Sequence, residues 1–109
     1  MGKKGDKMTE AATPAAEGLK DALGHLGDIR LRKMFGGYGV FEESLMFALV
    51  DKTGGIFFKA DDSNLQTFLE AGAEKHGRMP YYRVPADVLA DEAKLEKWAR
   101  SSLLVAKKK

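Results

Sequence analysis

The chain has 109 residues, enough for one domain of ordinary size. Apolar residues make up 44% of it and charged residues 31%, which is typical of a globular protein and argues against disorder over most of its length. It has no cysteine, which excludes disulfides, thiolate metal sites and cysteine chemistry. The longest apolar run, Leu45–Val50, is far shorter than the roughly 20 residues of a membrane-spanning helix. Since the first residues also lack the apolar stretch of a secretion signal, we expect a cytoplasmic domain.

The small positive charge lies at the two ends of the chain. The formal charge is +2, from 18 basic and 16 acidic residues, and six of the basic residues are terminal: Lys3, Lys4, Lys7, Lys107, Lys108 and Lys109. Without these six, and without Asp6 and Glu10, 12 basic residues remain against 14 acidic ones, a charge of −2. A folded nucleic-acid binder usually concentrates positive charge on its folded surface. We therefore interpret residues 1–12 as a disordered tail, 13–106 as the domain and 107–109 as a basic tail.

The domain is predicted to begin with a helix. Thr13 followed by Pro14 is a typical helix start, with Thr as the N-cap and Pro in the first turn. The leucines at positions 19, 23 and 26 recur with helical spacing and form one apolar stripe. Gly27 follows this stripe and predicts a left-handed C-terminal cap.

An antiparallel meander is expected next. Apolar and basic residues alternate over 29–32, which predicts a half-buried strand, and a second strand is expected over 38–41. The apolar run 45–50 predicts the central strand. The residues 51–55, Asp-Lys-Thr-Gly-Gly, are typical of a tight turn into a further strand over 56–59.

The second half of the domain is expected to add two helices, a short helical turn and an edge strand. Asp61, Asp62 or Ser63 is expected to cap a helix that ends at Gly72, with Leu65, Phe68 and Leu69 on one face. Residues 79–84 predict an edge strand because Pro80 lacks an N–H group, and a helical turn follows over 85–89. Asp91 caps a final helix with the apolar stripe Leu95, Trp98, Ala99, Ser102 and Leu103. The order of elements predicts a single small α+β domain: an antiparallel sheet with helices packed against it.

Residue patterns give little support to catalysis, a metal site or a cofactor. The two histidines, His25 and His76, lie in no motif, and a lone imidazole is more simply explained by structure than by catalysis. Neighbouring carboxylates such as Glu42 and Glu43 point to opposite sides of a strand and do not converge. We therefore expect a non-enzymatic protein that needs no cofactor or metal ion. An enzyme with an unrecognised site is the least favoured alternative.

The most unusual local feature is the glycine string Gly36-Gly37-Tyr38-Gly39. It matches neither nucleotide-binding fingerprint, and no helix is expected directly after it. Gly37–Phe41 partly resembles the strand of RNA-recognition modules whose aromatic side chains stack on bases. The simpler interpretation is that Tyr38 and Phe41 point to opposite faces as ordinary packing residues. By the same reasoning, Trp98 is interpreted as a core residue rather than the anchor of a partner groove.

Together these residues resemble a known family. The string Arg32-Lys33-Met34-Phe35-Gly36-Gly37-Tyr38-Gly39-Val40-Phe41, followed by Met46–Leu49, is similar to the TfoX/Sxy N-terminal domain family. Further similar segments are Ile56–Lys59, Met79–Tyr82, Val84-Pro85 and Leu95–Ala99, which contains Trp98. The resemblance covers about Leu19 to Ala106. Met34, Phe35, Gly36, Gly37, Gly39 and Trp98 are the positions of this similarity that we expect to determine the fold.

This resemblance implies a bacterial protein with a strongly bent antiparallel sheet flanked by helices. Full-length members are positive regulators of competence (DNA uptake) genes, thought to work with the cyclic-AMP receptor protein, and they have a second, C-terminal domain. We therefore expect a short, stand-alone member that acts as a regulatory or adaptor module on a protein partner, with Arg30, Arg32, Lys33 and Tyr38 as its contact surface. A nucleic-acid-binding module that uses the same strand and the lysine tails is the alternative. A homodimer is a further option for the assembly.

Overall fold

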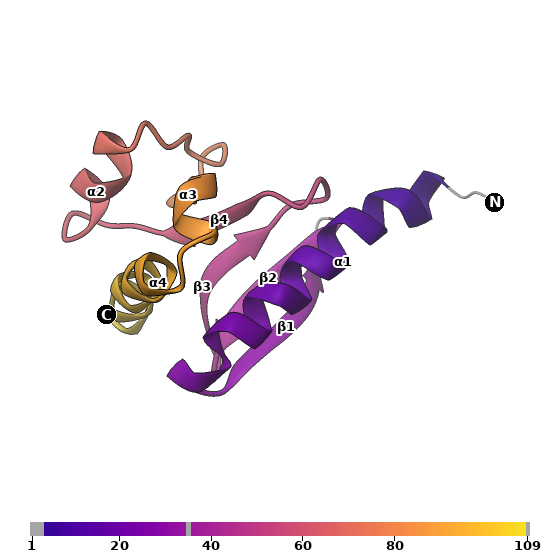
Figure 1. Cartoon of the computed structure of the whole chain (residues 1–109), viewed down its shortest axis with the longest axis horizontal. Helices are drawn as coiled ribbons and strands as arrows, with labels where there is room; N and C mark the ends of the chain where they lie inside the picture. The colour runs from indigo at the N-terminus through magenta and orange to yellow at the C-terminus, as the bar shows by residue number, and fades with distance from the viewer. Residues whose placement is uncertain (1–3, 35, 109) are drawn as a thin grey trace.

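A computed structural model of the chain describes residues 4–34 and 36–108 (Figure 1). The elements follow in the order α1 (Lys4–Leu23), η1 (Gly24–Leu26, a 3-10 helix), β1 (Ile29–Met34), β2 (Gly37–Glu42), β3 (Leu45–Val50), β4 (Ile56–Lys59), α2 (Leu65–Glu70), β5 (Tyr81–Arg83), α3 (Ala86–Leu89) and α4 (Glu92–Lys107). The five strands form one antiparallel sheet in the order β1-β2-β3-β4-β5. The predicted α+β class, the meander, the central position of β3 and the edge position of β5 are confirmed.

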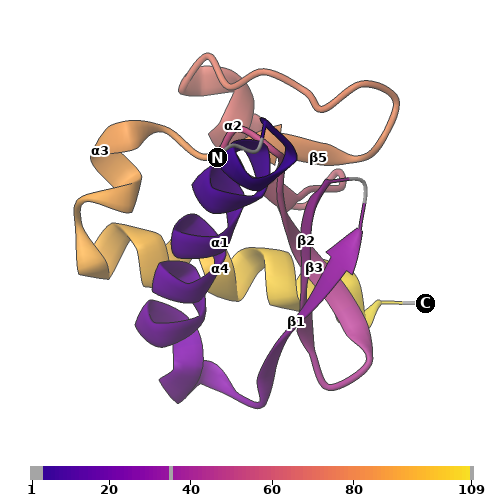
Figure 2. The same cartoon turned by 90° about the vertical axis from the view of Figure 1, so that its right-hand side faces the viewer.

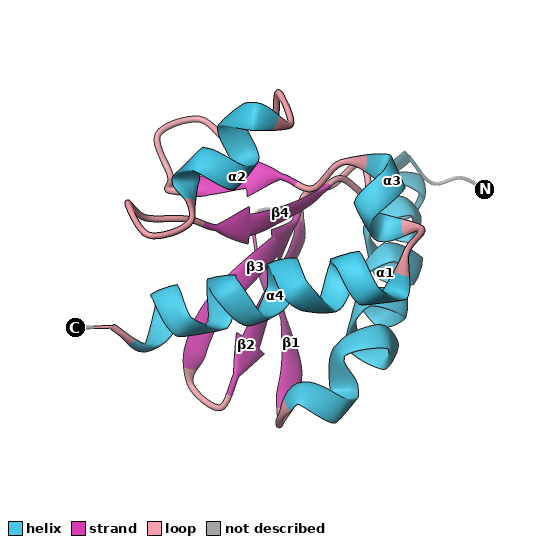
Figure 3. Ribbon diagram, turned by 60° about the vertical axis from the view of Figure 1, so that its left-hand side comes forward, coloured by secondary structure: helices cyan, strands magenta, loops and turns pink. Residues whose placement is uncertain are grey.

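The helices pack against one face of this sheet. Helix α1 lies along β1 and β2, and α4 crosses β3 and β4 (Figure 3). Figure 2, which looks along the molecule, shows α1 beside the strands and α4 crossing behind it, and side chains of both helices belong to the same core. Between the two layers lies the main core, which includes the fully buried side chains of Val40, Phe47 and Phe58. We refer to this side of the sheet as the helix face and to the other side as the open face.

The start of the first helix was predicted wrongly. Helix α1 begins at Lys4, so Pro14 lies inside it, and the predicted tail over 1–12 is helical from Lys4 onward. On either side of Pro14 the helix is buried through small residues, since Ala12 and Ala16 are 0% exposed. Such burial offsets the backbone hydrogen bond that a proline inside a helix removes. The sequence signal was missed because two alanines hardly register as an apolar stripe.

Two helix caps also differ from the prediction. Helix α1 ends at Leu23, and Gly27 has an extended backbone (φ 160°, ψ −162°) rather than a left-handed one. Helix α2 has Asn64 at its N-cap, while Asp61 organises the preceding turn by accepting hydrogen bonds from the Ser63 backbone N–H and hydroxyl at 2.8 and 2.6 Å. These two bonds hold the pKa of Asp61 down at about 2. The predicted end of α2 at Gly72 (φ 72°) is confirmed.

Two further sequence predictions are confirmed by side-chain contacts. The Asp51 carboxylate closes the turn between β3 and β4 by accepting from the Thr53 hydroxyl at 2.8 Å and the Gly55 backbone N–H at 2.8 Å. Asp91 caps α4 by accepting from the Lys94 backbone N–H at 3.1 Å. At the other end of α4, Lys107 is helical and Lys108 forms the C-cap, so the predicted basic tail overlaps this helix. Among the described residues, no helix is long and apolar enough to cross a membrane.

Candidate partner-binding face

The structure separates the four predicted contact residues onto two faces of the sheet. Arg30 and Arg32 alternate with Ile29 and Leu31, which pack against the helix-face core, so the two arginines point to the open face. Lys33 is the cross-strand partner of Tyr38. Since residues directly opposite in a sheet share a face, Lys33 lies on the helix face with Tyr38. The four residues therefore do not lie together on one face of the sheet, and their role as a contact surface stays a prediction.

Tyr38 has a structural position. Its ring packs against the main core, and its hydroxyl shares a hydrogen bond of 2.8 Å with the Thr13 hydroxyl of α1. This bond fastens the first half of α1 to β2. Phe41, three residues farther along the strand, points to the open face, as the simpler interpretation of the two aromatic residues expects.

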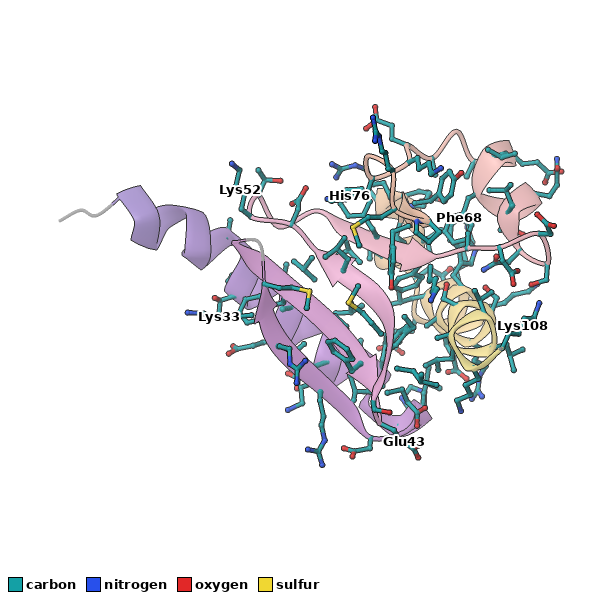
Figure 4. The ribbon with its side chains drawn as sticks, turned by 180° about the vertical axis from the view of Figure 1, so that it is seen from behind. Lys33, Glu43, Lys52, Phe68, His76 and Lys108 are labelled. Atoms are coloured by element: carbon teal, nitrogen blue, oxygen red, sulfur yellow. The ribbon has the colours of Figure 1, made fainter. Side chains whose placement is uncertain are left out.

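The side chains of the open face are apolar or cationic. Following the pairing register from strand to strand, the open face consists of Arg30, Arg32, Met34, Gly37, Gly39, Phe41, Met46, Leu49, Phe57, Lys59, Tyr81 and Arg83. Four of these strand positions are cations and none is a carboxylate. Figure 4 looks at this face, and the yellow sulfur atoms lie over the strands. A chain whose body has a net negative charge therefore presents a locally positive surface here.

Two of these cations are fixed on aromatic rings. The Arg32 guanidinium lies 5.5 Å from the centroid of the Phe41 ring, and that of Arg83 lies 4.9 Å from the centroid of Phe57. Such cation–π contacts hold a flexible side chain in one orientation and contribute about 0.5–1 kcal/mol at exposed sites. Arg30 donates a hydrogen bond of 3.1 Å to the Asp28 carboxylate, and both side chains are more than half exposed. The arginines are thus positioned but open to a partner.

Other parts of the chain cover the open face on the β4–β5 side and leave the β1–β2 side open. On the β4–β5 side, Leu49, Phe57 and Tyr81 form a small second core, and His76 of the preceding loop lies edge-on to Phe57 at 4.7 Å (Figure 4). On the β1–β2 side, Met34, Phe41 and Met46 remain half-buried. A hollow of about 270 Å³ lies between the two halves, lined by Met34, Leu49, Val50, Asp51, Lys52, Thr53 and His76.

The glycine string determines the fold of this face. A Cβ atom on Gly37 would lie 1.9 Å from the Val50 carbonyl oxygen, so only glycine permits this approach of β2 to β3. A Cβ atom on Gly39 would lie 2.8 Å from the Met46 sulfur and 3.0 Å from that of Met34. Gly36 (φ 78°) makes the turn from β1 to β2. Phe35 lies outside the described residues. The register shift between β2 and β3 falls at Val40/Phe41 and not at the glycines, and the extra residue there is Phe47 of β3.

Trp98 and the histidines have structural contacts too. Trp98, predicted as a core residue, is half-buried, and its ring packs edge-on against the buried Phe68 at 4.8 Å. It also lines a groove of about 370 Å³ between α2, α3 and α4. His25 bonds the Glu96 carboxylate of α4 at 3.0 Å, which lowers the pKa of Glu96. Among the side chains that the structure describes, within residues 11–34 and 36–108, no three histidines or carboxylates are placed to hold a metal ion.

Sequence reasoning missed Met46, Lys59 and Arg83 as parts of the open face. Lys59 and Arg83 share this face through the pairing of β4 with β5, which joins residues far apart in the chain, and Met46 joins it as the cross-strand partner of Phe41. The separation of Arg30 and Arg32 from Lys33 could have been predicted, because alternate residues of a strand point to opposite faces.

Tyr81 gives a direct test of the second core. Burial raises its pKa to about 12, from 10.0, and its hydroxyl donates to the Met46 carbonyl at 3.3 Å. The stability that depends on neutral Tyr81 is complete below pH 10 and is lost as the pH rises through 12. We expect Tyr81→Phe to remove the tyrosinate absorbance change near pH 12 and to reduce the loss of stability over this interval. An unchanged alkaline titration in the variant would show that Tyr81 is not the buried tyrosine.

Comparison with known proteins places this geometry in a family. No curated protein matches the chain. The model of the family described as the TfoX N-terminal domain matches residues 21–106, which span the end of α1, the whole sheet and all but the last helical residue of α4. This match covers well over half of the chain and includes every strand of the open face. The chain belongs to the TfoX N-terminal domain family.

Proposed function

We propose that this chain is a non-enzymatic regulatory or adaptor module that binds a protein partner through the β1–β2 half of the open face. The observation that carries the proposal is the combination found there: Arg30 and Arg32 beside the half-buried Met34, Phe41 and Met46. Membership of the family supports a role related to that of competence regulators. We propose that this chain acts in the cytoplasm.

The side chains on this half suit a protein partner. Arginine, methionine and aromatic residues are enriched at the centres of protein interfaces, and methionine adapts its shape to different partner surfaces. The arginine of an interface also loses less conformational freedom when its side chain is already ordered. Arg32 meets this condition because it rests on Phe41.

The test is capture of partners from the native host's lysate after nuclease treatment. We expect the natural chain to retain a stoichiometric protein partner and the double variant Arg30→Glu/Arg32→Glu to lose it. Thermal stability should change little, because both side chains are exposed, the Arg30–Asp28 ion pair is weak, and the contact of Arg32 with Phe41 contributes about 0.5–1 kcal/mol. A matched control, Lys94→Glu/Lys97→Glu, reverses two exposed charges on α4 and should capture the partner normally. Retention of the partner by Arg30→Glu/Arg32→Glu would overturn the proposal.

A nucleic-acid-binding module is the second candidate, supported by the four cations on the open face. Two observations favour it less. Arg32 and Arg83 cover the rings of Phe41 and Phe57, which are then not free to stack on bases. Of the terminal lysines, Lys107 lies 3.3 Å from the Glu42 carboxylate and Lys108 lies 3.1 Å from that of Asp61. Capture that collapses with nuclease and falls steeply with salt would favour this candidate.

A further inference from the structure

The two edges of the sheet differ in their covering. At β5, the loop that precedes it supplies an additional short pairing: the Arg83 N–H donates to the Glu74 carbonyl at 2.8 Å, and the His76 N–H donates to the Tyr81 carbonyl at 2.8 Å. At the opposite edge, β1 has six residues and pairs, within the described part of the chain, with β2 alone. The outward N–H and C=O groups of alternate β1 residues are therefore available to another strand.

Side chains along β1 select what can pair with it. Arg30 and Arg32 line the open-face side of this edge, and Leu31 and Lys33 line the other side. The strand has three cations and no carboxylate. A cationic edge strand repels strands of like charge, which is one way in which proteins prevent edge-to-edge aggregation.

A second copy of this chain is a poor partner for β1. Since only alternate residues of β1 point their N–H and C=O groups outward, an antiparallel pair of two copies places each residue opposite one of the same alternate set. The two registers of greatest overlap then place Arg30 opposite Arg32, or Arg32 opposite Arg32. Like charges directly opposite each other destabilise a strand pair. The charges that disfavour a homodimer through this edge favour a strand of opposite charge.

We propose that β1 binds an acidic segment of a partner in extended conformation, as a sixth strand of the sheet. In this arrangement backbone hydrogen bonds hold the segment to the edge, and alternate carboxylates lie beside Arg30 and Arg32. The intervening side chains of the segment, apolar or β-branched, lie beside the half-buried Leu31 on the helix face. The incoming carboxylates replace Asp28, whose pair with Arg30 is exposed and therefore weak. This inference rests on the proposed function and specifies the chemistry of its partner.

The experiment uses the full chain and a synthetic peptide of roughly eight residues, long enough to span β1, in which Glu alternates with Val. We expect binding that weakens about tenfold or more in Arg30→Glu/Arg32→Glu but not in Lys94→Glu/Lys97→Glu. Two N-methylated versions of the peptide distinguish pairing with the β1 edge from attraction between charges alone. Successive N–H groups of a strand point to opposite sides, so one peptide is methylated on the alternate N–H groups that would face β1 and the other on those that would face away. Methylation of one alternate set should weaken binding at least about tenfold, and methylation of the other set should leave it nearly unchanged.

Each other outcome overturns the inference in a distinguishable way. Equal effects of the two methylation patterns would mean that the acidic peptide is bound by its charges and not as a strand, and the proposed function would stand. Failure of the peptide to bind would exclude an acidic strand partner, while the lysate capture still tests the adaptor role by itself. Self-association of the chain that Arg30→Glu/Arg32→Glu abolishes would identify a second copy as the occupant of β1.

Discussion

Replacement of Gly37 by alanine is expected to destabilise the domain by at least about 3 kcal/mol, a large share of the stability of a small domain. The added Cβ atom would lie 1.9 Å from the Val50 carbonyl oxygen and 2.9 Å from its carbonyl carbon. Both are backbone atoms of the central strand, so no side-chain rotation relieves the clash. The register of β2 on β3 would have to change, and with it the open face. Chemical denaturation measures the loss directly.

Gly18 provides the matched control. It lies on the exposed side of α1, and a Cβ atom added there meets no atom within 4 Å. Gly18→Ala should therefore stabilise the domain by about 0.5–1 kcal/mol, because alanine loses less backbone entropy than glycine in a helix. If Gly37→Ala were as stable as the natural chain, the close approach of β2 and β3 would be contradicted.

Replacement of Phe68 by alanine is expected to cost about 3–5 kcal/mol. Phe68 is 1% exposed, and its ring contacts Trp98 of α4 at 4.8 Å and Tyr82 of β5 at 5.8 Å between centroids. It therefore joins α2, α4 and the sheet. Its removal leaves a cavity that the short helix α2 cannot fill. The change in unfolding free energy should appear in both near-UV circular dichroism and denaturant titration.

The adjacent Leu69 serves as the control, since the sequence pattern places it on the same buried face as Phe68. In the structure Leu69 is 51% exposed. Leu69→Ala should cost less than about 0.5 kcal/mol, as is usual for surface substitutions. Comparable losses for Leu69→Ala and Phe68→Ala would support the sequence prediction against the structure.

Local patterns predicted those parts of the fold that local chemistry determines. Asp51 closes its turn and Asp91 caps α4 because each carboxylate bonds backbone N–H groups within a few residues. The start of α1 before Thr13 was not predicted, and the buried residue there, Ala12, is too small to register as an apolar stripe. The pattern placed Leu65, Phe68 and Leu69 on one face of α2. In the structure α2 buries a narrower face, which includes Phe68 and leaves Leu69 exposed.

On the open face, too, some residues could be predicted from local sequence and others could not. Arg30 and Arg32 could be recognised as outward residues from the alternation of β1. Lys59 and Arg83 could not, since they share the face through the pairing of β4 with β5, across more than 20 residues of sequence. Gly37 was expected to matter for backbone geometry. Glycine is required at position 37 because the Val50 backbone approaches it closely. The φ angle of Gly37 is not positive, whereas that of Gly36 is.

Hydrogen–deuterium exchange of the chain with and without its captured partner tests the central claim most directly. The claim is that the partner binds at Arg30, Arg32 and the adjoining β1–β2 half of the open face. We expect exchange to slow over residues 29–34 and to stay unchanged in α2 and α4. Slower exchange confined to the groove beside Trp98, with 29–34 unaffected, would contradict it.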